Sequence, residues 1–279
     1  MNGHFVKMQG AGNDFILIDN RLGIWPLDAL HLRRWCDRRL GVGADQLLVL
    51  EETRRPDADF RYRIFNADGG EVEQCGNGAR CMTRWVLERI FPGECVRFET
   101  MRAVIRGSIG KDGLVSVEMG IPILEADDLP FRTDGLSYCG GAWRGFGLSG
   151  ADELCVLAVG NPHAVRFGPM PEDEVFRRTG ERLQDHPAFP EGINFECVCP
   201  RSDSEADFRV WERGVGETPA CGSGACAAAV AGMLTGRFGR TVTFHTRGGI
   251  LRVRRPDPDG PVFLEGPAEY VFEGDLPLD

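Results

Sequence analysis

Two copies of a short cysteine and glycine motif are the residues best suited to chemistry. The first is Cys75-Gly76-Asn77-Gly78-Ala79, and the second, 146 residues later, is Cys221-Gly222-Ser223-Gly224-Ala225. Each precedes a run with helical spacing, so each sulfur is expected at a helix N-terminus, where the helix dipole favours the thiolate over the thiol. The glycines leave backbone N–H groups free to bind an anion.

This pattern suits racemisation of an amino acid. Two such helices with converging N-termini would hold one carboxylate and place a sulfur on each side of the neighbouring carbon. One sulfur, as thiolate, would remove the proton, and the other, as thiol, would donate one to the opposite face. N–H donors on the carboxylate would stabilise the carbanion. Cys75 and Cys221 are therefore the predicted acid/base pair.

The lysine content argues against a pyridoxal cofactor. The chain has two lysines, Lys7 and Lys111, and Lys111 lies in Gly110-Lys111-Asp112-Gly113, which has the composition of a turn. A pyridoxal enzyme needs a pocket lysine for its Schiff base. No Cys-x-x-Cys or His-Glu-x-x-His metal motif is present. We therefore expect an enzyme with no cofactor and no metal.

Composition limits the other classes. A formal net charge of −10 argues against nucleic acid as a partner. The chain has no apolar run long enough to span a bilayer and no signal-peptide pattern at its start. We expect a cytoplasmic protein that does not bind membranes, with its ten cysteines reduced.

An internal repeat extends beyond the cysteines. Asn13 matches Asn161 and Gln46 matches Asn194 at an offset of 148, while Asn66 matches Glu212 at 146, the offset of the cysteines. Four features thus recur in register with a single two-residue difference. The repeat predicts a duplicated fold with a boundary near residue 122, at the start of a linker-like stretch over 122–150.

Hydrophobic periodicity supplies the expected elements. Helices are predicted over 25–40, 76–89, 171–180 and 222–236, and strands over 47–50, 60–64, 195–198 and 208–211. Cys81 and Cys226 fall inside two of the helices and are expected to be inert. His163 is either a structural histidine or a residue that tunes a nearby thiol.

Taken together, these motifs resemble those of the diaminopimelate epimerase family. The resemblance runs from about residue 5 to the end of the chain. It rests on motifs that occur in the family's order: Gly12-Asn13-Asp14-Phe15, Gly43-Ala44-Asp45-Gln46, Phe65-Asn66-Ala67-Asp68-Gly69, Cys75 to Cys81, Gly160-Asn161-Pro162-His163, Glu212-Arg213-Gly214 and Cys221-Gly222-Ser223-Gly224.

The resemblance implies an α/β (α+β) fold of two pseudo-symmetric domains, each a β-barrel-like sheet around a central helix. Residues 1–121 with 266–279 would form the domain of Cys75, and residues 122–265 that of Cys221. The implied activity is the cofactor-independent interconversion of LL-2,6-diaminopimelate and meso-2,6-diaminopimelate, in lysine and peptidoglycan-precursor biosynthesis.

The resemblance also assigns roles to residues. His163 and Glu212 would modulate the pKa of the cysteines, and the chain would form a homodimer through a segment that includes Tyr270. The implied substrate-binding residues are Asn13, Gln46, Asn66, Gly76, Asn77, Asn161, Asn194, Glu212, Arg213, Gly222 and Ser223.

Three rival interpretations remain open from the sequence. A proline or hydroxyproline racemase shares the two-cysteine logic but should not need so many polar residues for the far end of its substrate. An isomerase of the same fold would leave Cys75 and Cys221 incidental. A binding module would hold diaminopimelate without exchanging its α-proton.

Overall fold

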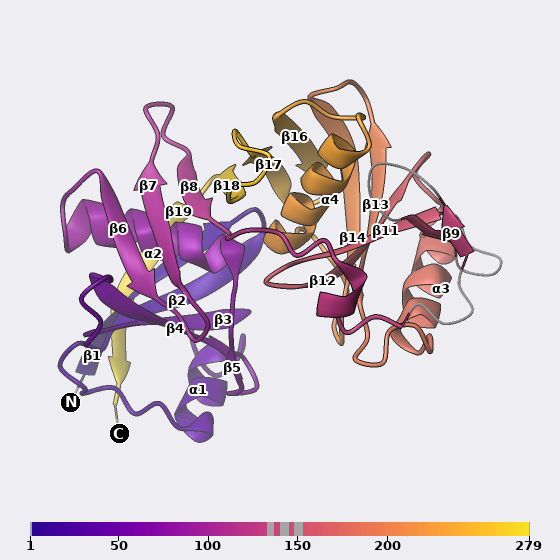
Figure 1. The fold of residues 1–279 in the computed structure, drawn as a ribbon. Helices are drawn as coiled ribbons and strands as arrows, with labels where there is room; N and C mark the ends of the chain where they lie inside the picture. The colour runs from indigo at the N-terminus through magenta and orange to yellow at the C-terminus, as the bar shows by residue number, and fades with distance from the viewer. Residues whose placement is uncertain (1, 133–136, 140–144, 148–152, 279) are drawn as a thin grey trace. The chain divides into compact units, whose positions relative to one another are not determined.

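The computed structural model describes residues 2–132, 137–139, 145–147 and 153–278. The chain divides into two compact units, Met1–Glu118 with Glu265–Asp279 (unit 1) and Met119–Leu264 (unit 2) (Figure 1). These bounds lie within a few residues of the expected domain boundaries. Part of the stretch 122–150 falls outside the described residues.

Unit 1 is a curved sheet around a central helix. β19 pairs with β1 and β1 with β2 in antiparallel fashion, β2 runs parallel to β3, β3 and β4 are antiparallel, β4 is parallel to β6, and β6–β7–β8 are antiparallel. The central helix packs against β1, β2, β3, β6, β7 and β8. The elements are β1 (Asn2–Gly10), β2 (Asn13–Asp19), α1 (Ala29–Cys36), β3 (Gln46–Glu51), β4 (Phe60–Asn66), β5 (Glu71–Val72), the central α2 (Gly76–Arg89), β6 (Cys95–Glu99), β7 (Val104–Ile109), β8 (Val115–Glu118) and β19 (Glu269–Pro277).

Unit 2 repeats the arrangement around α4, which packs on β11, β12, β13, β16 and β17. A 3-10 turn (Ala126–Asp128) and the short strands β9 (Ser137–Cys139) and β10 (Gly145–Gly147) precede the repeated part. Its elements are β11 (Glu153–Val159), β12 (Asn161–Phe167), α3 (Asp173–Gln184), β13 (Asn194–Pro200), β14 (Glu205–Glu212), β15 (Gly216–Thr218), α4 (Gly222–Leu234), β16 (Thr241–Thr246) and β17 (Gly249–Arg254), with β18 (Phe263–Gly266) leading back to unit 1.

Strand register confirms the predicted duplication. In the parallel pair β2–β3, Phe15 lies opposite Gln46, and in β12–β13 His163 lies opposite Asn194, at the offset of 148. Further on, Phe98 opposite Ile105 matches Phe244 opposite Leu251, at the offset of 146. The predicted α/β fold of two pseudo-symmetric halves is therefore correct.

Two of the predicted helices have different bounds, one for a local and one for a tertiary reason. α1 begins only at Ala29, because the Asp28 side chain caps it by accepting from the N–H of Leu30 at 3.0 Å. Trp25 belongs to the apolar pattern because it packs edge-on against Trp35, with ring centroids 5.2 Å apart, and not because it is helical. α3 continues through Gly180, where the Trp211 ring occupies the space of a side chain.

The central helices are buried along most of their length. α4 buries its alanines, and α2 buries even Arg80, whose guanidinium donates to Asn77 Oδ1 at 3.0 Å and to the Pro267 carbonyl at 3.2 Å. Small residues allow the sheet to approach the helix closely, and Gly107 of β7 lies directly against Thr83 of α2. No helix in the described part of the chain is long and apolar enough to cross a membrane.

We expect Gly107→Ala to destabilise unit 1 by about 1–3 kcal/mol through overpacking. An added Cβ would lie 2.0 Å from Thr83 Oγ1. Gly93→Ala is the matched control, because its Cβ meets nothing closer than 3.8 Å. Denaturant unfolding of the three proteins measures the difference, and equal stability of the two variants would contradict this packing.

Candidate active site

Cys75 opens the central helix of unit 1, as predicted. It is the N-cap residue of α2, and its sulfur accepts a hydrogen bond from the Gly78 N–H at 3.3 Å. The half-buried sulfur also lies 3.8 Å from Asn13 Oδ1. One of the predicted amides therefore lies directly beside one of the predicted sulfurs.

A charged network behind Asn13 determines how its amide is turned. Asn13 Nδ2 donates to Asp45 Oδ2 at 2.7 Å, which leaves Oδ1 on the side of Cys75. Arg38 joins Asp45 to Asp14 with bonds of 2.8 and 2.7 Å, and the buried Lys7 binds Asp14 at 2.7 Å. The Lys7 ammonium is thus committed to an ion pair and to the Gly43 carbonyl.

The same network perturbs Asp14. Burial alone would raise the pKa of this carboxyl, but hydrogen bonds from Arg38 and Lys7 lower it well below its ordinary value. Asp14 is therefore a carboxylate that holds two cations behind the site. The other lysine, Lys111, lies in an exposed turn between β7 and β8, as predicted.

The two other predicted amides of unit 1 meet each other. Gln46 begins β3 and Asn66 ends β4, and they are register partners in the antiparallel pair. Gln46 Nε2 donates to Asn66 Oδ1 at 2.8 Å, while Gln46 Oε1 is buried without a hydrogen-bond partner among the described residues. Gly76 and Asn77 lie buried in the first turn of α2.

Cys221 occupies the equivalent position in unit 2, where its side chain is more buried than that of Cys75. It is the N-cap residue of α4, is 6% exposed, and lies 3.4 Å from Ser223 Oγ. Burial raises the pKa of the Cys221 thiol well above its ordinary value, and the carboxyl of Glu212 raises it further. The surroundings of Cys221 therefore favour the thiol over the thiolate.

Glu212 ends β14 next to Cys221. Thr218 donates to its Oε1 at 2.5 Å. Burial raises the pKa of the Glu212 carboxyl, and the hydrogen bonds from Thr218 and Cys221 oppose that shift. Glu212 thus disfavours a negative charge on Cys221, whereas the Cys221 thiol, as a hydrogen-bond donor, favours the charged form of Glu212.

Asn194 and Arg213 are joined through the backbone. The Asn194 amide donates to the Pro162 carbonyl at 2.9 Å and accepts from the Arg213 N–H at 3.0 Å. The exposed Arg213 side chain donates to the Glu191 carbonyl at 3.3 Å. Asn194 therefore anchors the loop that carries Arg213.

Glu196, beside His163, was not among the residues predicted from the sequence. The buried imidazole lies between Asn161 Oδ1, 2.9 Å from Nε2, and Glu196 Oε1, 2.6 Å from Nδ1. Both His163 and Glu196 are fully buried. A signal for Glu196 was present, because a glutamate interrupts the apolar strand predicted over 195–198.

Each unit thus gathers polar side chains where its central helix begins. In unit 1, Asn13, Gln46 and Asn66 lie at one edge of the sheet, with Cys75 beside Asn13. In unit 2, Glu212 lies beside Cys221, and His163 joins Asn161 to Glu196. Across the described ranges, no three His, Cys, Asp or Glu side chains come together in a way that could hold a metal ion.

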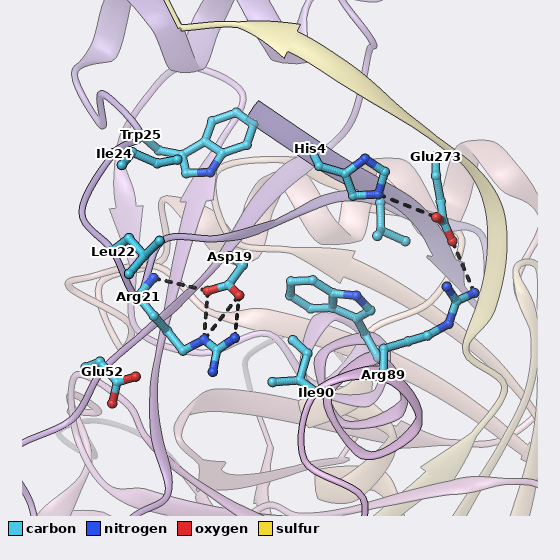
Figure 2. A pocket seen from close by; sticks show the side chains of 12 residues that line it. His4, Asp19, Arg21, Leu22, Ile24, Trp25, Glu52, Arg89, Ile90 and Glu273 are labelled. Atoms are coloured by element: carbon cyan, nitrogen blue, oxygen red, sulfur yellow. Dashed lines mark hydrogen bonds and ion pairs between the residues drawn. The ribbon is translucent and has the colours of Figure 1, made fainter. Parts of the chain in front are cut away.

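A cavity of about 670 Å³ lies elsewhere in unit 1 (Figure 2). Its lining includes His4, Asp19 and the indole of Trp25, and none of the predicted site residues. Two ion pairs lie in its wall: Asp19 with Arg21 at 2.7 Å, and Glu273 with the Arg89 guanidinium at 3.1 Å. This cavity is therefore separate from the cysteine sites.

Comparison with known proteins decides the family. The family model of diaminopimelate epimerase matches residues 5–124 and 155–271. The chain belongs to the diaminopimelate epimerase family. The interruption of the match falls on the linker-like stretch between the two halves.

Its similarity to family members extends over nearly the whole chain. It is 44% identical over 278 residues to the diaminopimelate epimerase of Azotobacter vinelandii, covering 98% of this chain and 99% of the relative. It is 42% identical to that of Aromatoleum aromaticum over 281 residues, covering 100% of both.

Solved structures of other proteins show the same fold at low sequence identity. A hydroxyproline epimerase from Agrobacterium vitis has a TM-score of 0.67 at 14% identity, covering 99% of this chain and 91% of that one. A PhzF-family protein from Bacillus anthracis has a TM-score of 0.63 at 15% identity, covering 99% of both. These likenesses confirm the fold alone.

The pKa of Asp14 predicts an acid-sensitive contribution to stability. Because that pKa is lower in the folded than in the unfolded chain, the carboxylate stabilises the folded state above about pH 4, and the stabilisation is lost as pH falls below it. At pH 7, Asp14→Asn should destabilise the protein by about 2 kcal/mol.

Thermal unfolding at several pH values measures this contribution. The gap between wild type and Asp14→Asn should stay constant from pH 6 to about 4, narrow measurably by about pH 3, and close only as the pH falls through the lowered pKa of Asp14. The exposed Asp57, paired with Arg55 at 2.8 Å, supplies the control, and Asp57→Asn should change little. A gap that persists unchanged at pH 3 would contradict the role of the Asp14 charge.

Proposed function

We propose that this chain is a cofactor-independent epimerase that interconverts LL- and meso-diaminopimelate, in lysine and peptidoglycan-precursor biosynthesis, with Cys75 and Cys221 as its acid/base pair. One observation carries the proposal. A cysteine begins the buried central helix in each half of a duplicated fold, in a chain 41–44% identical to diaminopimelate epimerases.

The proton transfer uses one sulfur on each face of the α-carbon. The thiolate takes the α-proton and becomes a thiol, while the electron pair of the broken C–H bond remains on the carbon. The other thiol then donates its proton to the opposite face and becomes a thiolate. The two sulfurs thereby exchange roles, and the reverse reaction uses them in the opposite order.

The different surroundings of Cys75 and Cys221 suit a pair in which one sulfur accepts a proton while the other donates one. Cys221 is a buried thiol with a raised pKa, as a proton donor requires, whereas the half-buried Cys75 accepts an N–H hydrogen bond at its sulfur. Glu212 raises the pKa of the Cys221 thiol by its negative charge. His163 lowers the pKa of Glu212, and we assign it the predicted role in tuning Cys221 through that carboxyl group.

The first turns of the two central helices supply the carboxylate site. Backbone N–H groups of Gly76 and Asn77 in α2, and of Gly222 and Ser223 in α4, would donate to the substrate carboxylate and stabilise the carbanion next to it. No bound metal or pyridoxal ring is required in this scheme.

Diaminopimelate has an amino acid group at each end, so its binding site needs both donors and acceptors. Glu212 and the amides of Asn13, Gln46, Asn66 and Asn161 supply them. We assign Asn194 to positioning the Arg213 backbone, because its own amide is already bound on both sides.

The decisive experiment follows LL-diaminopimelate in D2O by NMR, with pure protein and no added cofactor. Deuterium should enter one α-carbon as the meso isomer forms. Cys75→Ala and Cys221→Ala should each reduce epimerisation at least about 10³-fold. Each variant should still exchange the α-proton of one stereoisomer only, because a single sulfur can remove and return a proton on its own face.

Controls separate the rivals. Cys81→Ala removes a buried thiol inside α2 and should leave the reaction intact. Proline offered in place of diaminopimelate should not exchange, whereas rapid exchange of proline alone would replace the proposal with a proline racemase. Full activity of Cys75→Ala would show that the cysteines are incidental, and tight binding without exchange would indicate a binding module.

We also propose that the protein is a cytoplasmic homodimer. β19 exposes Val271 and Phe272, at 55% and 47%, beside Tyr270, whose ring lies 5.0 Å below the Arg89 guanidinium. Adjacent exposed apolar side chains of this kind favour a protein contact.

Sedimentation equilibrium tests the dimer. Wild type should have twice the mass of one chain, and Val271→Glu should weaken association at least about tenfold by placing a charge in the contact. Leu40→Glu, at a side chain 83% exposed elsewhere in unit 1, is the control and should remain dimeric. A monomeric wild-type protein would overturn the proposal.

A further inference from the structure

A buried polar pair in unit 2 has no equivalent in unit 1. His163 and Glu196 are fully buried and lie 2.6 Å apart. At the offset of 148, the same places in unit 1 hold Phe15 and Leu48, both fully buried and apolar. The duplicated fold is therefore stable with hydrocarbon here, and a histidine with a carboxyl group calls for a further reason.

The hydrogen bonds determine where the imidazole carries its proton. Nε2 lies 2.9 Å from Asn161 Oδ1, and because an amide oxygen can only accept, Nε2 carries a hydrogen. In a neutral ring Nδ1 is then an acceptor, and its partner Glu196 must donate. The alternative is an imidazolium facing a carboxylate.

Burial favours the neutral pair. Glu196 Oε2 has no hydrogen-bond partner among the described residues, and an unpaired carboxylate oxygen in a dry core is costly. Burial accordingly raises the pKa of Glu196, against the opposing effect of His163. The carboxyl group of Glu212 faces the same region, and charges on Glu196 and Glu212 disfavour each other. A charge on Glu196 would also raise the pKa of the Cys221 thiol.

We propose that Glu196 is a neutral carboxylic acid that donates to His163 Nδ1, fixes the ring as its Nε2–H tautomer, and so orients the amide of Asn161. Glu196 is a positioning residue, since it acts on Asn161 through His163. The bond to Nε2–H commits the amide oxygen and leaves the Nδ2 donors of the half-exposed Asn161 for the substrate. Only this last step rests on the proposed function.

The two equivalent amides are thereby held in opposite senses. Asp45 binds Asn13 through Nδ2, so that Asn13 presents an acceptor beside Cys75. His163 binds Asn161 through Oδ1, so that Asn161 presents donors. One duplicated position thus becomes an acceptor in unit 1 and a donor in unit 2, which suits a substrate with an ammonium and a carboxylate at each end.

The first test is ¹⁵N NMR of the histidine rings in the resting protein, which needs no substrate. Wild type should show His163 as a neutral ring protonated at Nε2. Glu196→Gln should keep that pattern, because the glutamine N–H replaces the acid proton. Glu196→Leu, which copies Leu48 of unit 1, should give a ring averaged between tautomers. An imidazolium in wild type, or an unchanged ring in Glu196→Leu, would overturn the proposal.

A second resting-state readout uses Cys221. Its alkylation by iodoacetamide, followed by mass spectrometry as a function of pH, should have the same profile in wild type and Glu196→Gln. If Glu196 were ionised, removing its charge would shift that profile to lower pH, and such a shift would contradict the neutral acid.

Kinetics connect the pair to the substrate. Glu196→Gln should stay within about twofold of wild type, while Glu196→Leu should raise KM for diaminopimelate about tenfold with a smaller effect on kcat, as the loss of an oriented hydrogen bond requires. Thermal unfolding checks that the variants fold. A loss of kcat without a change in KM in Glu196→Leu would contradict the positioning role. Absence of epimerisation in wild type would contradict the proposed function, but the NMR test of the neutral acid would remain valid.

Discussion

The rest of the structure depends on a helix that begins inside a curved sheet. The first N–H groups of a helix have no partner within it, and burying them would be costly. In unit 1 the Cys75 sulfur accepts the Gly78 N–H. Glycine is required at this third helical position, because a Cβ on Gly78 would lie 2.6 Å from the Tyr62 hydroxyl and one on Gly224 would lie 2.7 Å from Glu196. The same Cys-Gly-x-Gly motif thus provides both the cysteine that caps the helix and the glycine that the close packing requires.

The two units share one backbone arrangement, but different side chains surround the central helix in each. The charged network of Lys7, Asp14, Arg38 and Asp45 lies behind the helix of unit 1. At the equivalent positions of unit 2, Pro162 and Ile193 replace Asp14 and Asp45. Unit 2 has its buried histidine and glutamate instead. Two sulfurs in equivalent positions therefore meet different surroundings, and the pKa of the Cys221 thiol is raised by its own.

Much of this arrangement could be predicted from residue spacing. The offsets of 148 and 146 reappear in the strand registers, because a two-residue period ties every side chain of a strand to one face. Helix bounds were less predictable. The pattern around Trp25 came from a contact with Trp35, and Gly180 continues a helix because Trp211 fills the space above it.

The sequence by itself determined the duplication, the two cysteines at helix starts and the edge of each sheet where the polar residues gather, since these follow from local periodicity and spacing. Only the tertiary structure decided the orientation of the side-chain amides and which of the two thiols is buried. An asparagine can face either way until a partner distant in sequence, such as Asp45 for Asn13, engages one end of it. Likewise the burial of Cys221, and with it the raised pKa of its thiol, depends on the side chains that the fold packs around the start of α4.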